Sequence, residues 1–411
     1  MAEHKVQCRR VVDAPPEVVW ALLQDFCAAW HPHLEWLKPE KSGQMRVFKV
    51  KGDDTIYREK LTSFSNSDRV LRYEHVEGIC DIDFYRGECR VEVNEGKSVI
   101  HWFAHFSAPE PRAAEIAEGT RLIFEAGLGA LSEIFVLKDE KVIGMPLLAV
   151  SSTVKHEGPL LLFLHGIGGN RKNWRSQLYG VAPFCQAASL DLRGYGESPL
   201  GPDQSRVDDY CHDILRVMQH FVKEKVVLCG LSYGSWIATS FAMRFPDQLA
   251  GLILCGGCTG MSEAPVEERI SFFKARQKPL DEGKSPKDFA QGVVDIIAGP
   301  NASGPVRQEL LASMAAIPGT TYRDAVWCFT HPIERFDFTK ITCPVLMMTG
   351  AHDKLASPSE IRGVVERIHA AGQSPLVQFE IISDAGHVCN LENSEQFNYH
   401  LLHFMGIHLK P

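Results

Sequence analysis

The sequence contains no long hydrophobic run and no excess of positive charge. None of its apolar stretches approaches the roughly 20 residues that a helix needs to cross a bilayer. Its 43 lysines and arginines are outnumbered by 51 aspartates and glutamates, which gives a net charge of −8. Proteins that hold nucleic acid or an anionic membrane through surface charge are usually basic instead. The composition therefore predicts no nucleic-acid partner and no membrane association.

A compact cysteine framework is also missing. The 12 cysteines are scattered through apolar segments, as at Cys27, Cys185, Cys229 and Cys343. Disulfide-rich secreted domains are short and rich in loops, whereas free thiols are kept reduced in the cytosol. We therefore expect a cytoplasmic protein.

One pair of cysteines, Cys255 and Cys258, has the C-x-x-C spacing. A zinc site would need two further ligands at a matching spacing, and a redox pair of the thioredoxin type would open a helix in a different fold. Buried thiols are the simpler interpretation, and we expect no metal site.

The length of 411 residues is too great for one ordinary core, since a typical domain has about 150 residues. The pattern of predicted elements changes near residue 140, which divides the chain into residues 1–140 and residues 141–411. In the first part, residues 4–13 predict a strand and residues 16–29 a surface helix with Pro16 in its first turn. Five strand candidates follow, at residues 44–50, 54–63, 69–76, 84–94 and 98–107. A long apolar helix over residues 113–137 closes the unit.

This arrangement resembles the α+β helix-grip architecture of the START-like superfamily (SRPBCC), in particular its polyketide cyclase/dehydrase branch. The resemblance is carried by Ala14-Pro15-Pro16-Glu17-Val18-Val19-Trp20, Tyr57-Arg58-Glu59-Lys60-Leu61, Leu71-Arg72-Tyr73 and Val99-Ile100-His101-Trp102. It implies a ligand-binding cavity and no particular chemistry. The candidate polar residues of that cavity are His31, His33, Trp36, His101 and His105.

The second part alternates strands and helices. Residues 159–164 are a continuous apolar run of the kind found in strands buried on both faces of a parallel sheet. Further buried strands are predicted near residues 187–190, 226–231, 249–255, 344–350 and 377–382. We therefore expect an α/β fold with a doubly wound, mostly parallel sheet. Residues 262–335 interrupt the alternation with helices and predict a cap above the carboxyl ends of the strands.

The motif Gly230-Leu231-Ser232-Tyr233-Gly234 directly follows one buried strand and precedes a helical pattern. Gly-x-Ser-x-Gly in this context is a nucleophile elbow, a turn so sharp that it holds the serine in a strained conformation above the sheet. Taken alone, the motif could also be an ordinary strand–loop–helix junction. Its context favours Ser232 as a nucleophile.

A serine nucleophile needs a base, and the base needs an acid that fixes its tautomer. Asp353 follows the predicted strand 344–350, and His387 follows the strand 377–382. Both therefore lie at the carboxyl edge of the sheet, in the order Ser, Asp, His. Asp337 precedes its strand, Asp384 is too close to His387 in sequence, and His352 is interpreted as a neighbour of the acid.

The oxyanion of such a reaction requires N–H donors that are already in place. The backbone N–H of Tyr233 follows the nucleophile, and the second predicted donor is Ile167 in His165-Gly166-Ile167-Gly168-Gly169. This glycine-rich segment lacks both Gly-Lys-Ser/Thr and Gly-x-Gly-x-x-Gly, so we expect no nucleotide.

Residues 145–411 resemble the α/β-hydrolase family through four motifs in the family's order. These are His165-Gly166, Asp191-Leu192-Arg193-Gly194-Tyr195-Gly196-Glu197-Ser198, the segment Gly230–Gly234 and Ala385-Gly386-His387. The segment 386–393 is similar to that of 3-oxoadipate enol-lactonases and related esterases, although Ser235 replaces a glycine common in them. The resemblance implies an esterase or lactonase.

The leading interpretation is a serine hydrolase without a cofactor that cleaves a carboxylic ester or lactone of a hydrophobic small molecule. Two alternatives remain open. The same three residues could cleave a C–C or thioester bond, or the second domain could be a non-catalytic sensor or carrier while the START-like domain binds the ligand.

Overall fold

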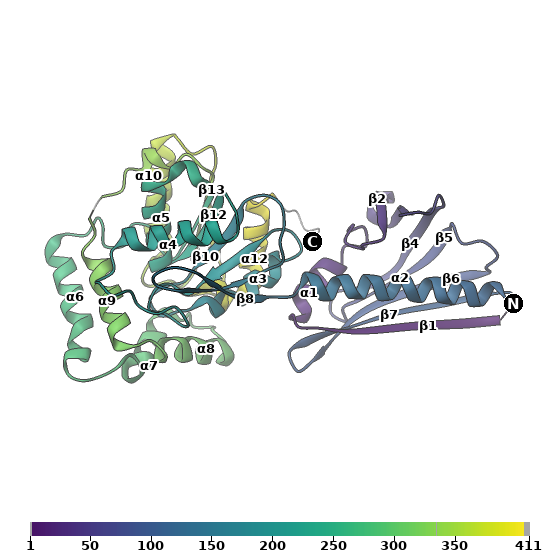
Figure 1. Cartoon of the computed structure of the whole chain (residues 1–411), viewed down its shortest axis with the longest axis horizontal. Helices are drawn as coiled ribbons and strands as arrows, with labels where there is room; N and C mark the ends of the chain where they lie inside the picture. Colours follow the sequence, from purple (N-terminus) through teal and green to yellow (C-terminus); the bar gives the residue numbers. More distant parts are fainter. Residues whose placement is uncertain (1, 334, 407–411) are drawn as a thin grey trace. The chain divides into compact units, whose positions relative to one another are not determined.

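The structure is a computed structural model that describes residues 2–333 and 335–406. The chain divides into two compact units with the boundary between Val136 and Leu137. Figure 1 shows the N-terminal unit in purple to blue and the C-terminal unit in teal to yellow.

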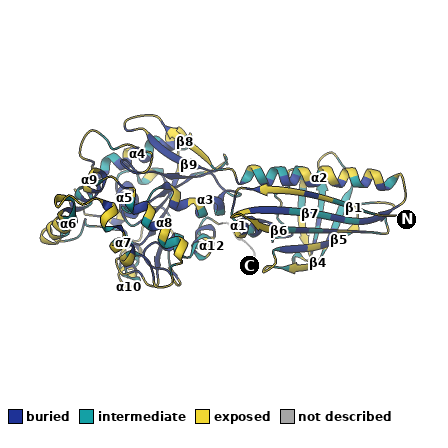
Figure 2. Cartoon of the chain, turned by 90° about the horizontal axis from the view of Figure 1, so that it is seen from below, coloured by how far each residue is buried: buried dark blue, intermediate teal, exposed yellow. Residues whose placement is uncertain are grey.

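The N-terminal unit is a seven-stranded antiparallel sheet that holds a long helix, α2 (Arg112–Ile134). The strands are β1 (Ala2–Val12), β2 (Leu34–Glu40), β3 (Met45–Val50), β4 (Ile56–Ser65), β5 (Val70–Glu77), β6 (Phe84–Asn94) and β7 (Lys97–Ala108). Strands β2 to β7 lie in sequence order, and β1 pairs with β7. One side of α2 is buried at helical spacing, for example at Ile116, Thr120 and Phe124, which gives the alternating bands seen along it in Figure 2.

Two local predictions for this unit were wrong. The first helix, α1 (Pro16–Leu23), is shorter than residues 16–29, and most of its residues are buried, so it is not a surface helix. The chain leaves the helix at a turn in which Asp25 accepts hydrogen bonds from the N–H groups of Cys27 and Ala28. Strand β2 was not predicted because it is an edge strand that contains Pro39 and has no alternating burial.

The N-terminal unit contains a cavity of about 350 Å³. Of the predicted polar residues, His31 and His33 line it, whereas Trp36, His101 and His105 do not. Trp102 lines the cavity, and side chains alternate along a strand, so His101 on the same strand points to the other face. The prediction that His101 and His105 line the cavity is therefore wrong, because both lie on the other face of β7.

His31 should make the stability of this unit depend on pH. Its Nε2 donates to the Ile123 carbonyl (2.9 Å), its Nδ1 accepts from the His33 N–H (3.2 Å), and burial lowers the pKa of His31 to about 4. Between that value and the ordinary value of about 6.5, the unfolded chain binds more protons than the folded one, so acid destabilises the fold. We expect a loss of about 3 kcal/mol between pH 7 and pH 4.

Denaturant unfolding at several pH values measures this loss. His31→Gln should reduce the pH dependence, and His33→Gln, which changes the exposed neighbour, should not. A pH dependence that is unchanged in His31→Gln would contradict the assignment.

The C-terminal unit is built on an eight-stranded sheet in the order β15-β14-β13-β12-β10-β11-β9-β8. The strands are β8 (Lys138–Val142), β9 (Leu148–Ser152), β10 (Leu160–Leu164), β11 (Ala187–Leu190), β12 (Val226–Leu231), β13 (Leu249–Cys255), β14 (Val345–Gly350) and β15 (Val377–Ile382). Only the pairs that involve β9 are antiparallel. The segment 138–152 is thus a hairpin at one edge of a parallel sheet.

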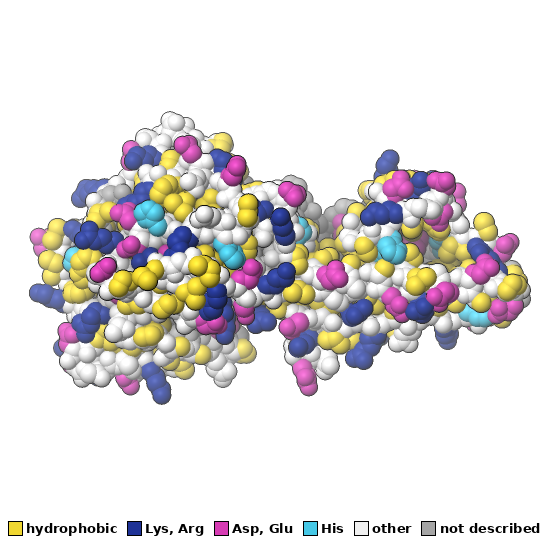
Figure 3. All heavy atoms as spheres, in the orientation of Figure 1, with side chains coloured by type: hydrophobic (Ala, Val, Ile, Leu, Met, Phe, Trp, Pro, Cys, Tyr) yellow, Lys and Arg dark blue, Asp and Glu magenta, His cyan; other side chains and the backbone are white. Residues whose placement is uncertain are grey.

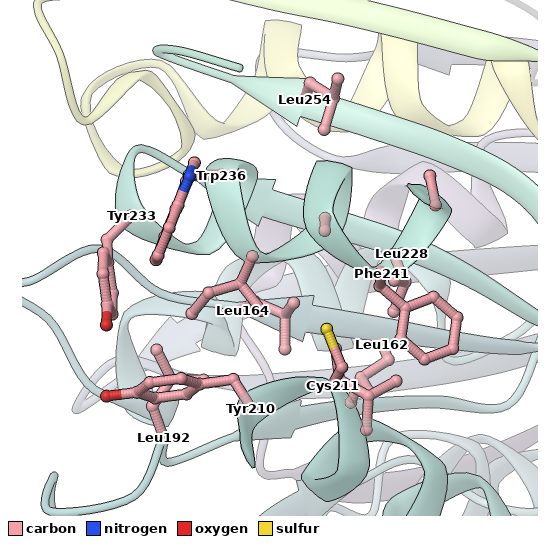
Figure 4. Close-up of a cluster of buried hydrophobic side chains, with 14 of the residues drawn as sticks. Leu162, Leu164, Leu192, Tyr210, Cys211, Leu228, Tyr233, Trp236, Phe241 and Leu254 are labelled. Atoms are coloured by element: carbon pink, nitrogen blue, oxygen red, sulfur yellow. The ribbon is translucent and has the colours of Figure 1, made fainter. Parts of the chain in front are cut away.

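Helices cover the sheet. They are α3 (Arg175–Val181), α4 (Val207–His220), α5 (Tyr233–Arg244), α10 (Pro358–Ala371), α11 (Cys389–Glu392) and α12 (Ser394–Phe404). Helix α5 packs on β12 and β13, and α4 packs on α5. Figure 4 shows this contact, in which Tyr210 of α4 meets Tyr233 of α5 edge to face and Tyr233 stacks on Trp236. The start of α5 is therefore anchored by fully buried aromatic rings.

The described part of the insertion between β13 and β14 contains the α-helices α6 (Val266–Asp281), α7 (Pro286–Ile297), α8 (Gly304–Ala315) and α9 (Gly319–Thr330). They lie together at the left and lower edge of the C-terminal unit in Figure 1. Among their aromatic residues, Phe272 and Phe329 line the pocket that also contains Ser232. Phe289 packs on Tyr322 instead, and Trp327 stacks on His331. The aromatic residues of the insertion thus divide between packing and the pocket.

Charged side chains of both signs are interspersed on the face shown in Figure 3. Among the residues that the structure describes, no helix is long and apolar enough to cross a membrane.

Candidate active site

Ser232 lies at the turn between β12 and α5, with φ 54° and ψ −112°, a conformation that side-chain-bearing residues rarely adopt. An added Cβ at Gly230 would overlap the carbonyl of Gly234, and one at Gly234 would overlap the carbonyl of Leu164. Both motif glycines are therefore required by close backbone approach. The Ser232 N–H donates to the Cys255 carbonyl (2.8 Å), which ties the turn to the neighbouring strand β13.

His387 and Asp353 lie together at the ends of β15 and β14. His387 Nδ1 is 2.9 Å from Asp353 Oδ2, and both side chains are buried. The other carboxylate oxygen, Oδ1, accepts from the N–H groups of Leu355 (2.8 Å) and Ala356 (3.0 Å). Burial raises the pKa of Asp353, but the hydrogen bonds from His387 and from these N–H groups outweigh it, so that this pKa lies below its ordinary value. The carboxylate thus stays ionised and fixes the ring.

Ser232, His387, Tyr233 and Ile167 all line one pocket of about 390 Å³. Asp353 is not among the lining residues and lies behind His387. Within the described residues Ser232 Oγ has no hydrogen-bond partner, and it is not a buried atom. The hydroxyl is therefore open to the pocket, in keeping with unliganded sites in which the nucleophile and its base have not yet closed on each other.

The loop that carries Ile167 is held by His165. His165 Nε2 accepts from the Leu192 N–H (3.1 Å), so Nδ1 carries the proton and donates to the Gly166 carbonyl (2.8 Å). The Gly169 N–H closes a turn onto the same carbonyl (3.0 Å), with Ile167 directly after Gly166. Burial lowers the pKa of His165. A neutral histidine thus fixes the loop from which the second oxyanion donor was predicted.

The alternative residues lie elsewhere. Asp337 is exposed and caps a short helical turn through the Thr339 N–H (3.1 Å). Asp384 is exposed and accepts from Asn301 Nδ2 (2.8 Å), while the side chain of His352 is exposed beside Asp353. Only Asp353 contacts the ring of His387 among these candidates.

Glu392 holds the loop of His387, and the sequence analysis did not single it out. Its Oε2 accepts from the N–H groups of Gly299 (2.7 Å) and Gly386 (3.0 Å), and its Oε1 accepts from Val388 (3.3 Å). The His387 N–H donates to the Ile297 carbonyl (2.8 Å) at the end of α7. One carboxylate therefore joins the histidine loop to the helical insertion.

Glu392→Gln should lower kcat about tenfold with little change in KM, because a neutral amide cannot accept all three N–H groups and His387 loses its fixed position. Steady-state kinetics on a p-nitrophenyl ester, together with the melting temperature, measure the effect. Glu395→Gln, which changes an exposed carboxylate in the next helix, is the matched control. Equal kinetics in the two variants would show that Glu392 does not position His387.

Cys255 and Cys258 are both buried, and Cys258 is among the residues that line the pocket. Burial raises the pKa of both thiols, that of Cys258 to about 12. Such thiols are poor nucleophiles and poor redox partners.

Comparison with known proteins matches a segment of each unit to a family model. Residues 159–291 match the family model of the alpha/beta hydrolase fold, and residues 3–135 match that of polyketide cyclase/dehydrase and lipid transport. The 3-oxoadipate enol-lactonase 2 of Acinetobacter baylyi is 22% identical over 246 residues, which cover 59% of this chain and 86% of that protein.

Solved structures show the same fold. For an esterase from Thermogutta terrifontis, the alignment has a TM-score of 0.56 at 24% identity. It covers 66% of this chain and 98% of the esterase chain. For the enol-lactonase of Burkholderia xenovorans LB400, the alignment has a TM-score of 0.54 at 18% identity. It covers 66% of this chain and 100% of the enol-lactonase chain. The C-terminal unit is therefore an α/β-hydrolase-fold domain. Its residues 159–291 match the family model of that fold, and the N-terminal residues 3–135 match the polyketide cyclase/dehydrase model.

Proposed function

We propose that the C-terminal domain is a serine hydrolase that cleaves a carboxylic ester or lactone of a hydrophobic small molecule. One observation carries the proposal: a strained serine at an elbow and a histidine held by a buried carboxylate open into the same pocket. The resemblance to an enol-lactonase and an esterase supports the choice of an ester bond.

The proposed reaction proceeds through an acyl-enzyme. Ser232 Oγ attacks the carbonyl carbon while His387 Nε2 takes its proton, and the carbonyl oxygen becomes an oxyanion held by the N–H groups of Tyr233 and Ile167. The C–O bond of the ester then breaks, and His387 gives its proton to the departing alkoxide. A water molecule, deprotonated by the same ring, releases the acid and restores Ser232. In a lactone the alcohol is part of the acyl group throughout, so hydrolysis of the acyl-enzyme releases a single hydroxy acid.

The pocket favours an apolar substrate. Much of its wall is hydrophobic, and the apolar side chains include Met261, Phe272, Val293, Leu310, Phe329 and Val364. Each methylene that such a wall buries contributes about 0.8 kcal/mol, or roughly fourfold in affinity. We therefore expect kcat/KM to rise from p-nitrophenyl acetate to p-nitrophenyl butyrate. The absence of hydrolysis of either ester would argue against the proposed function.

The rate should increase as the pH is raised, because only a neutral imidazole can take the proton of Ser232. Single-turnover rates on p-nitrophenyl butyrate measure the effect without interference from product release. His352→Gln, which changes the exposed neighbour, should leave the profile unchanged. A flat single-turnover profile would exclude His387 as the base.

A further inference from the structure

The inner face of the N-terminal sheet carries a buried ion pair that the hydrolase chemistry does not use. Arg46 of β3 and Glu59 of β4 are directly opposite each other in the sheet. Their side chains are only 19% and 10% exposed, and both line the cavity of this unit. Arg46 donates from Nε (2.6 Å) and Nη2 (2.5 Å) to a single oxygen, Oε2 of Glu59.

The second oxygen of Glu59 is left open. Within the described residues no hydrogen bond reaches Oε1, and this atom is not among the fully buried polar atoms that lack a partner. Since Glu59 lines the cavity, Oε1 is an acceptor that faces it. The guanidinium is fixed in turn, because it also donates to the Phe26 carbonyl (3.1 Å) and lies over the rings of Phe26 (4.3 Å) and Tyr73 (5.2 Å). The acceptor is thus held rigidly.

Hydroxyl groups around the cavity already have partners. Tyr57 donates to Asp53 (2.6 Å), Tyr73 accepts from Trp102 Nε1 (2.9 Å), and Tyr85 pairs with Thr120 (3.2 Å). Each of these three hydroxyls thus has a partner in the wall, whereas no described residue bonds to Oε1 of Glu59.

Stability does not explain this pair. Removing two charges from water costs as much as their attraction returns, so a buried ion pair is often no better for stability than apolar side chains of the same size. The open oxygen of Glu59 can accept a hydrogen bond from a donor that enters the cavity. A ligand with a hydroxyl or N–H group supplies that donor.

We propose that this cavity binds a planar, apolar small molecule that presents one hydroxyl or N–H donor to Oε1 of Glu59. A volume of about 350 Å³ lies in the range of small-molecule sites. Aromatic rings line it, among them Trp30, Phe48, Trp102 and Phe124, and they provide faces and edges for a flat ligand. A simple lipid chain without a donor leaves Glu59 unsatisfied and binds less well.

Two probes that differ in a single donor test the proposal on the full-length protein: 2-naphthol and its methyl ether, 2-methoxynaphthalene. Calorimetric titration should give at least about tenfold tighter binding of 2-naphthol, since a hydrogen bond to a charged group is worth about that much. Equal affinity for the two probes, or no binding of either, would overturn the proposal.

The double variant Arg46→Met with Glu59→Leu tests whether the preference for 2-naphthol arises at this ion pair. It removes both charges at nearly constant volume, so its melting temperature should be equal to or higher than that of the wild type. Its preference for 2-naphthol should disappear, while its hydrolysis of p-nitrophenyl butyrate stays unchanged. A preference that survives in this variant places the probes elsewhere and contradicts the proposal.

Glu59→Gln provides the same comparison if the double variant does not fold. It keeps the shape of the side chain but offers a neutral, weaker acceptor, so the preference for 2-naphthol should fall severalfold. An unchanged preference would contradict the role of Glu59. The binding of the two naphthalene probes does not depend on Ser232, so failure of the proposed hydrolase function and failure of this inference can be told apart.

Discussion

Replacing Ser232 by alanine is expected to lower kcat on p-nitrophenyl butyrate by at least about 10³-fold. The hydroxyl oxygen forms the covalent bond in the proposed reaction, and Ser232 lines the same pocket as His387. Alanine removes only this oxygen and meets the same backbone strain at φ 54° as serine does. The fold should therefore be unaffected, which circular dichroism and the melting temperature can verify.

Ser235→Ala is the matched control for this variant. Ser235 is buried one turn along α5, and its hydroxyl donates to the Gly257 carbonyl (2.6 Å). Its loss should cost about 1 kcal/mol of stability and leave kcat within a few-fold. A Ser232→Ala protein that retains most of its activity would mean that another group attacks the ester.

Asp353→Asn is expected to lower kcat by about 10⁴-fold without unfolding the protein. The carboxylate of Asp353 accepts a hydrogen bond from the protonated Nδ1 of His387 (2.9 Å). This leaves Nε2 unprotonated and able to take the proton of Ser232. An asparagine can donate to Nδ1 instead, and the ring then carries its proton on Nε2 and cannot act as a base. The loss should appear in kcat far more than in KM, because Asp353 is not among the residues that line the pocket.

Asp384→Asn makes the same chemical change three residues before His387. Asp384 is exposed, bonds to Asn301 and has φ 56°, a conformation that asparagine tolerates well. This variant should retain full activity. Comparable losses of kcat in Asp353→Asn and Asp384→Asn would indicate a general effect of charge near the His387 loop. Asp353 would then have no special role.

The sequence predicted the elements of the hydrolase sheet and the meeting of Asp353 with His387 because these signals are local. Each residue directly follows a buried strand, and parallel strands end at the same edge of a sheet. The glycines of the elbow are likewise adjacent in sequence to the serine that they allow.

Contacts between distant segments could not be predicted in this way. Glu392 reaches Gly299 across 93 positions, and nothing in the sequence around either residue signals the contact. The cavity of the N-terminal unit depends on the register of its strands, since a shift of one residue exchanges the two faces. His101 was assigned to the wrong face for this reason, and Arg46 and Glu59, which face the cavity, were not chosen. The opposite charges of Arg46 and Glu59 on consecutive strands were a usable signal.

The central claim is that Ser232 is the nucleophile of a hydrolase, and active-site labelling tests it most directly. The full-length protein is treated with a fluorophosphonate, digested and mapped by mass spectrometry. The account predicts one phosphonate per chain on the peptide that contains Ser232, with no labelling of Ser232→Ala and full labelling of Ser235→Ala. A label on any other residue, or no label on the folded wild-type protein, would contradict it.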